Sequence, residues 1–220
     1  TRVITQKIVY IIEECGYRAN SVFAVTFTNK ASREMKERIG GVLNKKLRRG
    51  LVVATFHNLC LRIMRSDPTA FGLRSRFSIF DAQDAYSLIQ QLLDRKYSRD
   101  KEFVMQVQST ISNWKNDMKF PEDVLKMPLE SHIEQMASSI YINYNEHLRT
   151  YNAVDFDDLI LLPVKFFLEN NKLLSVWQDK IRYLLVDEYQ DTNATQYLLV
   201  KLLVGVRAAF TVVGDDDQSI

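Results

Sequence analysis

Apolar residues in the first sixty positions follow two different spacings. Residues 2–15 carry them at helical spacing, which predicts a helix with one buried face. Two short continuous apolar runs, 22–27 and 51–55, predict buried strands. A helical pattern follows each run, from Asn29, read as the helix N-cap, to about Ile39, and again from about Asn58. Strands that alternate with helices predict a parallel sheet with right-handed crossovers.

The pattern changes between positions 64 and 167, where helical spacing dominates and β-branched runs are scarce. Four periodic segments are expected to be helices, with prolines at the joints: 81–95, 101–116, 130–151 and 155–168. The alternation then resumes, with strands at 181–186 and 210–213 and a helix at 193–204. We therefore predict an α/β fold in which a helical subdomain, 64–167, is inserted between two parts of one sheet domain, 1–63 and 168–220.

Composition narrows the class of protein without naming a partner. The 220 residues are 46% apolar and 25% charged, with a net charge of +2, which is ordinary for a soluble globular protein. Cys15 and Cys60 have no metal-site or disulfide spacing, so a reduced cytoplasmic setting is expected. The most apolar run, 159–168, is interrupted by Pro163 and Lys165 and is too short to cross a bilayer, so no membrane association is expected.

One stretch is strongly basic. Between positions 30 and 49, eight lysines and arginines stand against two glutamates. Such a stretch can neutralise phosphates and release counterions. It can equally be the solvated face of a helix, and the sequence alone leaves both interpretations open.

Two predicted strands end in acidic clusters. Asp187 and Glu188 follow the apolar run 183–186, and open α/β sheets bind ligands at the carboxyl ends of their strands. In a nucleotide hydrolase the first carboxylate holds Mg²⁺ and the second activates water. The alternative is an acidic pair that caps the next helix.

The second cluster follows the run 210–213. Gly214 permits a tight turn, and Gln218 carries both a donor and an acceptor, so it can sense a γ-phosphate. The alternative is a solvated loop of aspartates, Asp215 to Asp217.

Two further segments, 26–31 and 55–57, combine an aromatic residue with polar neighbours, as in grooves that bind single-stranded nucleic acid. A third segment, 155–159, places Phe156 among three aspartates. Phe27 and Phe56 could instead be core residues, and His57 a satisfied polar histidine. In the third segment, helix capping by Asp155 and first-turn acids could explain the carboxylates without any function, although Phe156 fits an apolar face poorly.

Together these pieces resemble the superfamily 1 helicases of the UvrD/Rep/PcrA type. ISNWKND and DFDDLILLP are closer to the Rep members than to the UvrD members. The matching strings keep the family's order across nearly the whole chain: TFTNKASREMKERI (26–39), ATFHNL (54–59), ISNWKND (111–117), DFDDLILLP (155–163), KIRYLLVDEYQDTN (180–193) and FTVVGDDDQSI (210–220).

The resemblance implies a RecA-like P-loop NTPase fold and a 3′-to-5′ DNA helicase of replication or repair that uses ATP and Mg²⁺. Asp187 would hold the metal, Glu188 would activate water and Gln218 would couple the γ-phosphate to movement. Thr1 would end the phosphate loop and contribute to Mg²⁺ binding. The implied partners are single-stranded DNA and single-strand/duplex junctions, contacted by Phe27, Thr28, Asn29, Lys30, Thr55, His57 and Phe156.

The resemblance also implies that parts of the motor are absent. The Gly-rich segment with its lysine is expected before Thr1, an aromatic-Trp-Arg-Gly stretch after Ile220, and a second motor domain beyond it. The isolated chain is therefore expected to hydrolyse ATP negligibly. Two alternatives stay open, a non-catalytic module that binds single-stranded nucleic acid and the motor subunit of a helicase–nuclease complex.

Overall fold

The computed structural model describes residues 2–206 and 208–215, so the predictions for Thr1 and Gln218 lie outside the described residues. The chain divides into two compact units. The first comprises residues 1–62 and 164–220, and the second comprises residues 63–163. The assignment of these units to a motor domain and its insertion remains a proposal.

The first unit contains a parallel four-stranded sheet, as the alternation of apolar runs predicted. The strand order is β2-β1-β5-β6, with bounds β1 (Val22–Thr26), β2 (Val52–Thr55), β5 (Tyr183–Val186) and β6 (Ala209–Val212). Thr26 pairs in register with Thr55, and Val186 pairs with Val212. The sheet thus joins segments from both ends of the chain, and all four strands end at the same edge.

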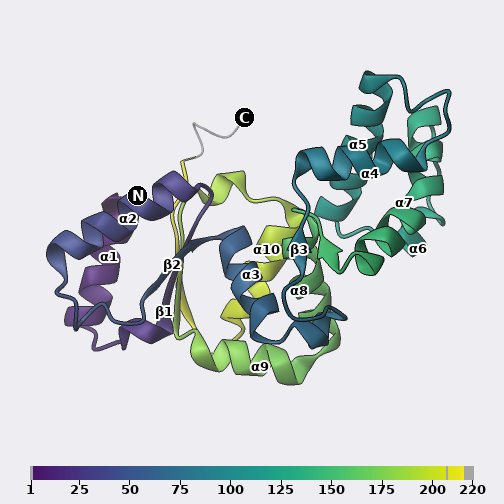
Figure 1. The fold of residues 1–220 in the computed structure, drawn as a ribbon. Coiled ribbons are helices and arrows are strands. Elements are labelled where there is room, and N and C mark those ends of the chain that lie inside the picture. Colours follow the sequence, from purple (N-terminus) through teal and green to yellow (C-terminus); the bar gives the residue numbers. More distant parts are fainter. Residues whose placement is uncertain (1, 207, 216–220) are drawn as a thin grey trace. The chain divides into compact units, whose positions relative to one another are not determined.

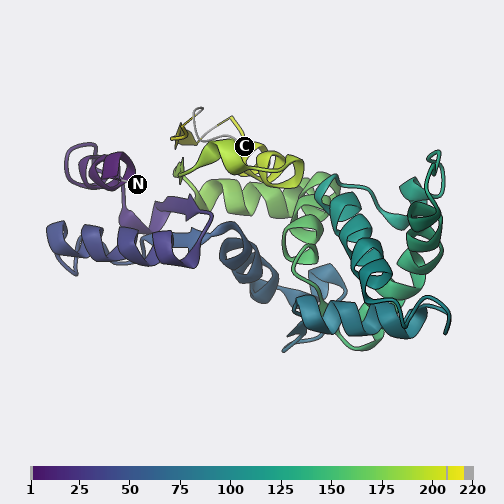
Figure 2. The ribbon, with the colours of Figure 1, turned by 90° about the horizontal axis from the view of Figure 1, so that it is seen from above.

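Helices cover both faces of this sheet (Figures 1 and 2). α1 (Arg2–Glu13) and α2 (Asn29–Val42) lie on one face, and α3 (Phe56–Ser66) and α10 (Ala194–Val204) lie on the other. Under the first pair, fully buried side chains such as Ile4, Ile8 and Met35 pack against strand residues such as Ala24 and Leu185. Each isoleucine buried in this way contributes about 1.5–3 kcal/mol.

Two helix starts differ from the sequence-based prediction. The N-cap of α2 is Thr28 and not Asn29, since the Thr28 hydroxyl accepts the Ala31 N–H at 3.0 Å. α3 begins at Phe56, two residues earlier than expected, and Thr55 Oγ1 accepts the Asn58 N–H at 3.2 Å. In both cases a threonine at the end of the strand or two residues beyond it accepts a helix N–H, so at most two residues separate each strand from its helix.

The second unit is built mainly from helices that pack around their own core. Its elements are η2 (Pro68–Phe71), β3 (Ser78–Ile79), α4 (Ala82–Leu92), α5 (Lys101–Asn116), α6 (Pro121–Val124), α7 (His132–Thr150) and β4 (Ala153–Val154). Val107, Ile111 and Trp114 of α5 share a buried cluster with Ile140 and Tyr144 of α7. β3 and β4 form a short parallel pair that the sequence pattern did not predict.

Two more helices complete the description. α8 (Asp158–Glu169) follows the second unit's last strand, and α9 (Asn171–Lys180) lies beside α10 in the first unit. α9 was not predicted, because only Trp177 among its residues is buried and its apolar spacing is correspondingly weak. None of the described helices is long and apolar enough to cross a lipid bilayer.

Candidate functional site

The candidate nucleotide site lies at the carboxyl edge of the parallel sheet. Asp187 follows β5 directly, and its backbone N–H donates to the Val25 carbonyl at 2.9 Å. Its side chain is buried, at 1% exposure. The strand therefore delivers a carboxylate to the edge where open α/β sheets bind ligands.

Glu188 turns the chain sharply after β5. Its backbone is left-handed, with φ 55° and ψ 45°, a conformation that costs a non-glycine residue about 1–3 kcal/mol and that concentrates at functional sites. The turn allows the Tyr189 N–H to donate to the Val213 carbonyl at 2.9 Å, which fastens it to the end of β6. The backbone of Glu188 is thus set by the neighbouring strand.

Gln190 connects the two acidic clusters, a role that the sequence did not reveal. Its Nε2 donates to Glu188 Oε2 at 2.9 Å, and its Oε1 accepts the Asp215 N–H at 3.1 Å. One amide side chain therefore joins the carboxylate after β5 to the backbone after β6. No spacing rule points to Gln190, because its partners are fixed only when β5 and β6 become neighbours.

Gly214 is explained by this same contact and not by the tight turn that the sequence suggested. Its φ is not among the positive values found in the described glycines. A Cβ at this position would lie only 2.7 Å from Gln190 Oε1 and 3.3 Å from the Gln190 backbone nitrogen. Glycine is needed here because the two strand ends approach closely.

The donor set at this edge suits a nucleotide-bound Mg²⁺. Among residues 2–206 and 208–215, no group of three or more His, Cys, Asp or Glu side chains could hold a metal alone. Magnesium at nucleotide sites is usually held by one or two carboxylates together with phosphates and water. A single buried carboxylate, Asp187, fits that chemistry.

The ends of β1 and β2 bring most of the predicted DNA-contacting residues of the first unit together. Asn29 Oδ1 accepts a hydrogen bond from Asn58 Nδ2 at 3.0 Å, while the Asn58 N–H is held by Thr55. Asn58 was not identified from the sequence, although it links two predicted segments. Thr28 and Lys30 are exposed beside this link, at the first turn of α2.

Aromatic residues accompany these polar groups. Phe27 is half-buried, and its ring meets that of Phe56 edge to face, with centroids 5.5 Å apart and planes at 70°. Phe56 is 2% exposed and is therefore a core residue, which was the alternative to a nucleic-acid contact. His57 is also half-buried, and burial lowers its pKa, so the imidazole is neutral at pH 7.

Phe156 belongs to the second unit and lies in a segment of acidic residues. Its side chain is 53% exposed, and it lines a cavity of about 580 Å³ together with Phe80, Met105 and Gln108. Ligand pockets commonly have volumes of about 300–1,000 Å³. The cavity therefore has the volume of a ligand pocket, and Phe156 is part of its lining.

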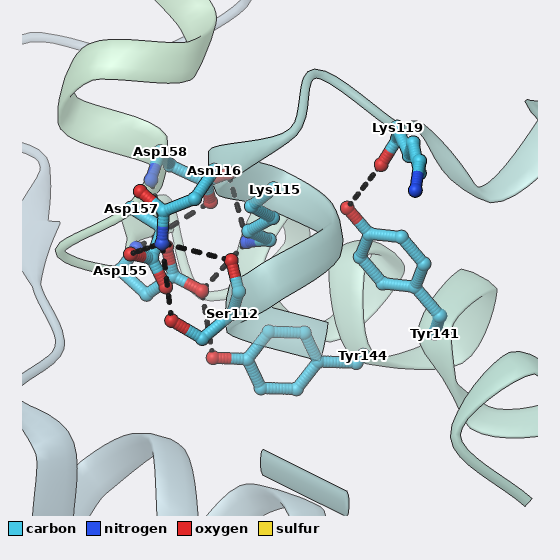
Figure 3. Close-up of polar contacts among 9 residues, drawn as sticks. All are labelled: Ser112, Lys115, Asn116, Lys119, Tyr141, Tyr144, Asp155, Asp157 and Asp158. Carbon is cyan, nitrogen blue, oxygen red and sulfur yellow. Dashed lines mark hydrogen bonds and ion pairs between the residues drawn. The ribbon is translucent and has the colours of Figure 1, made fainter. Parts of the chain in front are cut away.

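Capping does not account for the carboxylates around Phe156. Asp158 N–H does donate to Asp155 Oδ1 at 2.8 Å, but both side chains also bind a lysine. Lys115 Nζ lies 2.6 Å from Asp155 Oδ2 and 2.8 Å from Asp158 Oδ1, and its side chain is completely buried (Figure 3). We call Lys115, Asp155 and Asp158 the charge cluster.

Further hydrogen bonds tie this segment to α5 and α7. Tyr144 OH donates to Asp155 Oδ2 at 2.9 Å, and Asn116 Nδ2 donates to Asp157 Oδ1 at 3.1 Å (Figure 3). Burial and the Asp155 charge raise the pKa of Asp158 to about 6. Burial also disfavours ionised Asp155, but the Lys115 ammonium and hydrogen bonds lower its pKa on balance.

Comparison with known proteins was made for the whole chain. A family model described as "UvrD/REP helicase N-terminal domain" matches residues 1–220. The chain is 52% identical over 220 residues to the ATP-dependent DNA helicase Rep of Escherichia coli and 46% identical to that of Buchnera aphidicola subsp. Baizongia pistaciae. It is 40% identical over 221 residues to the ATP-dependent DNA helicase PcrA of Staphylococcus aureus.

These matches cover 100% of this chain but a minor part of each relative. The chain spans 32% of the length of the E. coli protein and 30% of the length of the S. aureus protein. The similarity therefore concerns one region of proteins about three times as long.

Proposed function

We propose that this chain, which belongs to the UvrD/REP helicase family, supplies the first motor domain of an ATP-dependent DNA helicase. The observation that carries the proposal is the carboxyl edge of the sheet, where buried Asp187 precedes the strained Glu188 and Gln190 joins Glu188 to the chain after β6. The activity, ATP-dependent unwinding of DNA, is inferred from the relatives, which are named ATP-dependent DNA helicases. Translocation from 3′ to 5′ and action in replication or repair, within the cytoplasm, belong to the same proposal.

The two carboxylates after β5 have different surroundings and therefore different proposed roles. Asp187 is buried at the strand end and would hold Mg²⁺ with the nucleotide phosphates, with a contribution from Thr1. The metal would offset the charge that develops during phosphoryl transfer. Glu188 is less buried, and its carboxylate would orient the attacking water and accept its proton.

The residues after β1 and β2 are proposed to contact single-stranded DNA. Phe27 supplies a half-buried aromatic ring, Lys30 is exposed three positions later, and Asn29 accepts a hydrogen bond from Asn58. Aromatic rings stack on bases without sequence preference, and cationic side chains follow the phosphates. Thr28, Thr55 and His57 would complete this surface, and Phe156 would contribute a second stacking surface.

Gln218 would report the γ-phosphate to the DNA-contacting elements. A second motor domain in the same polypeptide would close the nucleotide site, and single-strand/duplex junctions would be the physiological DNA. These assignments rest on family resemblance and on the strand order that makes β5 and β6 neighbours.

Replacement of Glu188 by Gln in the full-length protein tests the proposed base. The amide keeps the acceptor oxygen for Gln190 but cannot take a proton, so ATP binding should stay within about threefold while turnover falls by roughly 10²–10⁴. Fluorescent-nucleotide titration and DNA-stimulated phosphate release measure the two quantities.

Glu13→Gln is the matched control, because Glu13 is exposed at the end of α1. It should bind and hydrolyse ATP normally. Near-normal turnover by Glu188→Gln would remove Glu188 from the role of base.

A further inference from the structure

The charge cluster is an unusual feature of the second unit because it places an ammonium and two carboxylates in the protein interior. Lys115 is 1% exposed and Asp155 and Asp158 are 6% and 7% exposed. Burying such charges carries a large desolvation penalty, and apolar residues of similar volume are often at least as stabilising. Stability alone therefore does not explain the cluster, and its geometry suggests what else it does.

The cluster holds the chain on both sides of one residue. Asp155 precedes Phe156, and Asp157 and Asp158 follow it. Lys115 and Asn116, adjacent in the last turn of α5, bind all three carboxylates, at distances of 2.6 to 3.1 Å. Figure 3 shows these contacts converging from α5 and α7 on the acidic segment.

Between these anchored carboxylates the Phe156 side chain remains exposed. The carboxylates beside it are buried or half-buried, while Phe156 is 53% exposed and lines the cavity described above. Lys115 and Asp155, 40 residues apart in sequence, thus form an ion pair that fixes the backbone of the segment that carries Phe156. A binding group held in its productive position by surrounding side chains does not lose conformational freedom when the ligand arrives.

We propose that Lys115 is a positioning residue for single-stranded DNA: it holds Asp155 and Asp158 so that Phe156 is fixed where a base stacks on it. The inference rests on the proposed function, because it requires that Phe156 contacts DNA. Lys115 itself is buried and touches no base. It acts through the segment 155–158, and Asn116 assists it by holding Asp157.

The experiment compares five variants of the full-length protein. Three are single, Lys115→Met, Asn116→Ala and Phe156→Ala, and two are double, Lys115→Met/Phe156→Ala and Asn116→Ala/Phe156→Ala. Fluorescence anisotropy with oligo-dT gives the Kd for DNA, and 2-aminopurine within the oligonucleotide reports base stacking. DNA-stimulated ATP hydrolysis gives kcat at saturating DNA and the DNA concentration for half-maximal stimulation. Lys119→Met is the matched control, since its ammonium pairs with Asp117 at 3.3 Å in a largely exposed site.

The expected result has three parts. Phe156→Ala raises the Kd by roughly 5- to 100-fold, as the loss of one stacked base does. Lys115→Met raises it by a similar factor and loses the 2-aminopurine signal, yet keeps kcat at saturating DNA. In the Phe156→Ala background, Lys115→Met produces no further increase, because its target is gone.

Three outcomes overturn a stated claim. An unchanged Kd in Phe156→Ala refutes the proposed DNA contact itself. A weakened Phe156→Ala beside unchanged Lys115→Met and Asn116→Ala refutes the positioning role alone. Additive losses in the double variant refute it as well, since Lys115 would then act independently of Phe156.

Lys115→Met leaves two buried carboxylates without a cation and can fail to fold, which circular dichroism detects. In that case the Asn116→Ala variant tests the positioning role by itself. Asn116 is half-buried and binds Asp157, on the C-terminal side of Phe156, so its loss leaves the Lys115 ion pairs in place. It should raise the Kd severalfold in the Phe156 background and have no effect in the Phe156→Ala background. An Asn116→Ala Kd equal to that of the wild type would overturn the positioning role.

Discussion

Asp158→Asn tests whether the two carboxylates beside Lys115 share one proton. One ammonium compensates one carboxylate, so a second buried anion is unfavourable. Tyr141 and Tyr144 of α7 also face the cluster, and burial raises the pKa of both, so they stay neutral. Asp157 is the third such group; burial and the Asp155 charge raise its pKa, and this shift is common to the wild type and to Asp158→Asn. The pair should therefore hold a proton to a higher pH than an ordinary aspartate does.

The sign and size of the effect follow from the pKa of Asp158. It is about 6 in the folded chain, against an ordinary value of 3.8. Between these values the folded chain binds more protons than the unfolded chain, so the free energy of unfolding falls as pH rises. The contribution is complete below pH 3.8 and is lost as pH rises through 6. Two pKa units correspond to about 3 kcal/mol.

The titration of Asp155 does not contribute to the fall in unfolding free energy between pH 3.8 and 6. Its pKa is lowered, so its own contribution is present above the ordinary aspartate value and is lost only at lower pH. Asn at position 158 keeps an oxygen that can accept from Lys115 but has no proton to release. The free energy of unfolding of the wild type should therefore fall by about 2 kcal/mol relative to that of Asp158→Asn between pH 4.5 and 7.

Urea unfolding at a series of pH values measures this difference. The fluorescence of Trp114, which is buried in the core of the second unit, reports unfolding in a Trp177→Phe background. Asp117→Asn is the matched control, because it makes the same replacement at a largely exposed aspartate that pairs with Lys119. A pH-independent difference for Asp158→Asn would show that the reasoning about the shared proton is wrong.

Three further predictions concern the sheet edge, all for the full-length protein. Gln190→Ala should lower ATP turnover by roughly 10- to 100-fold with little change in ATP affinity, because it removes the hydrogen bond that orients Glu188. Turnover equal to that of the wild type in stopped-flow assays would contradict this. Phe27→Ala should weaken oligo-dT binding, measured by fluorescence anisotropy, by roughly 1–3 kcal/mol. Unchanged affinity would show that Phe27 is a core residue and does not contact DNA. Lys30→Gln should reduce the slope of log K against log salt concentration by about 0.7, and an unchanged slope would mean that Lys30 is only solvated.

The sequence predicted the sheet well because its signals are local. Continuous apolar runs such as 183–186 can only be buried strands in this context, and their alternation with helices dictates parallel neighbours. The strand order then brings the two acidic clusters to adjacent strands. The exposure of Phe156 also agrees with its poor fit to an apolar face.

What the sequence did not reveal depends on long-range contacts. Lys115 looks like any helical lysine, and its carboxylate partners lie 40 and 43 positions away. Gln190 reaches Asp215 across 25 positions. The short parallel pair β3–β4 likewise joins Ser78 to Ala153, too far apart for any periodicity to signal.

The joint at Gln190 has a mechanical consequence. Its bond to the Asp215 N–H is 3.1 Å long, and a donor–acceptor separation beyond about 3.5 Å is no longer a hydrogen bond. A shift of the chain after β6 by about half an ångström must therefore either break this link or pull the amide, and with it the Glu188 carboxylate, along. The position of the Glu188 carboxylate and the position of the chain after β6 are therefore linked through one side chain.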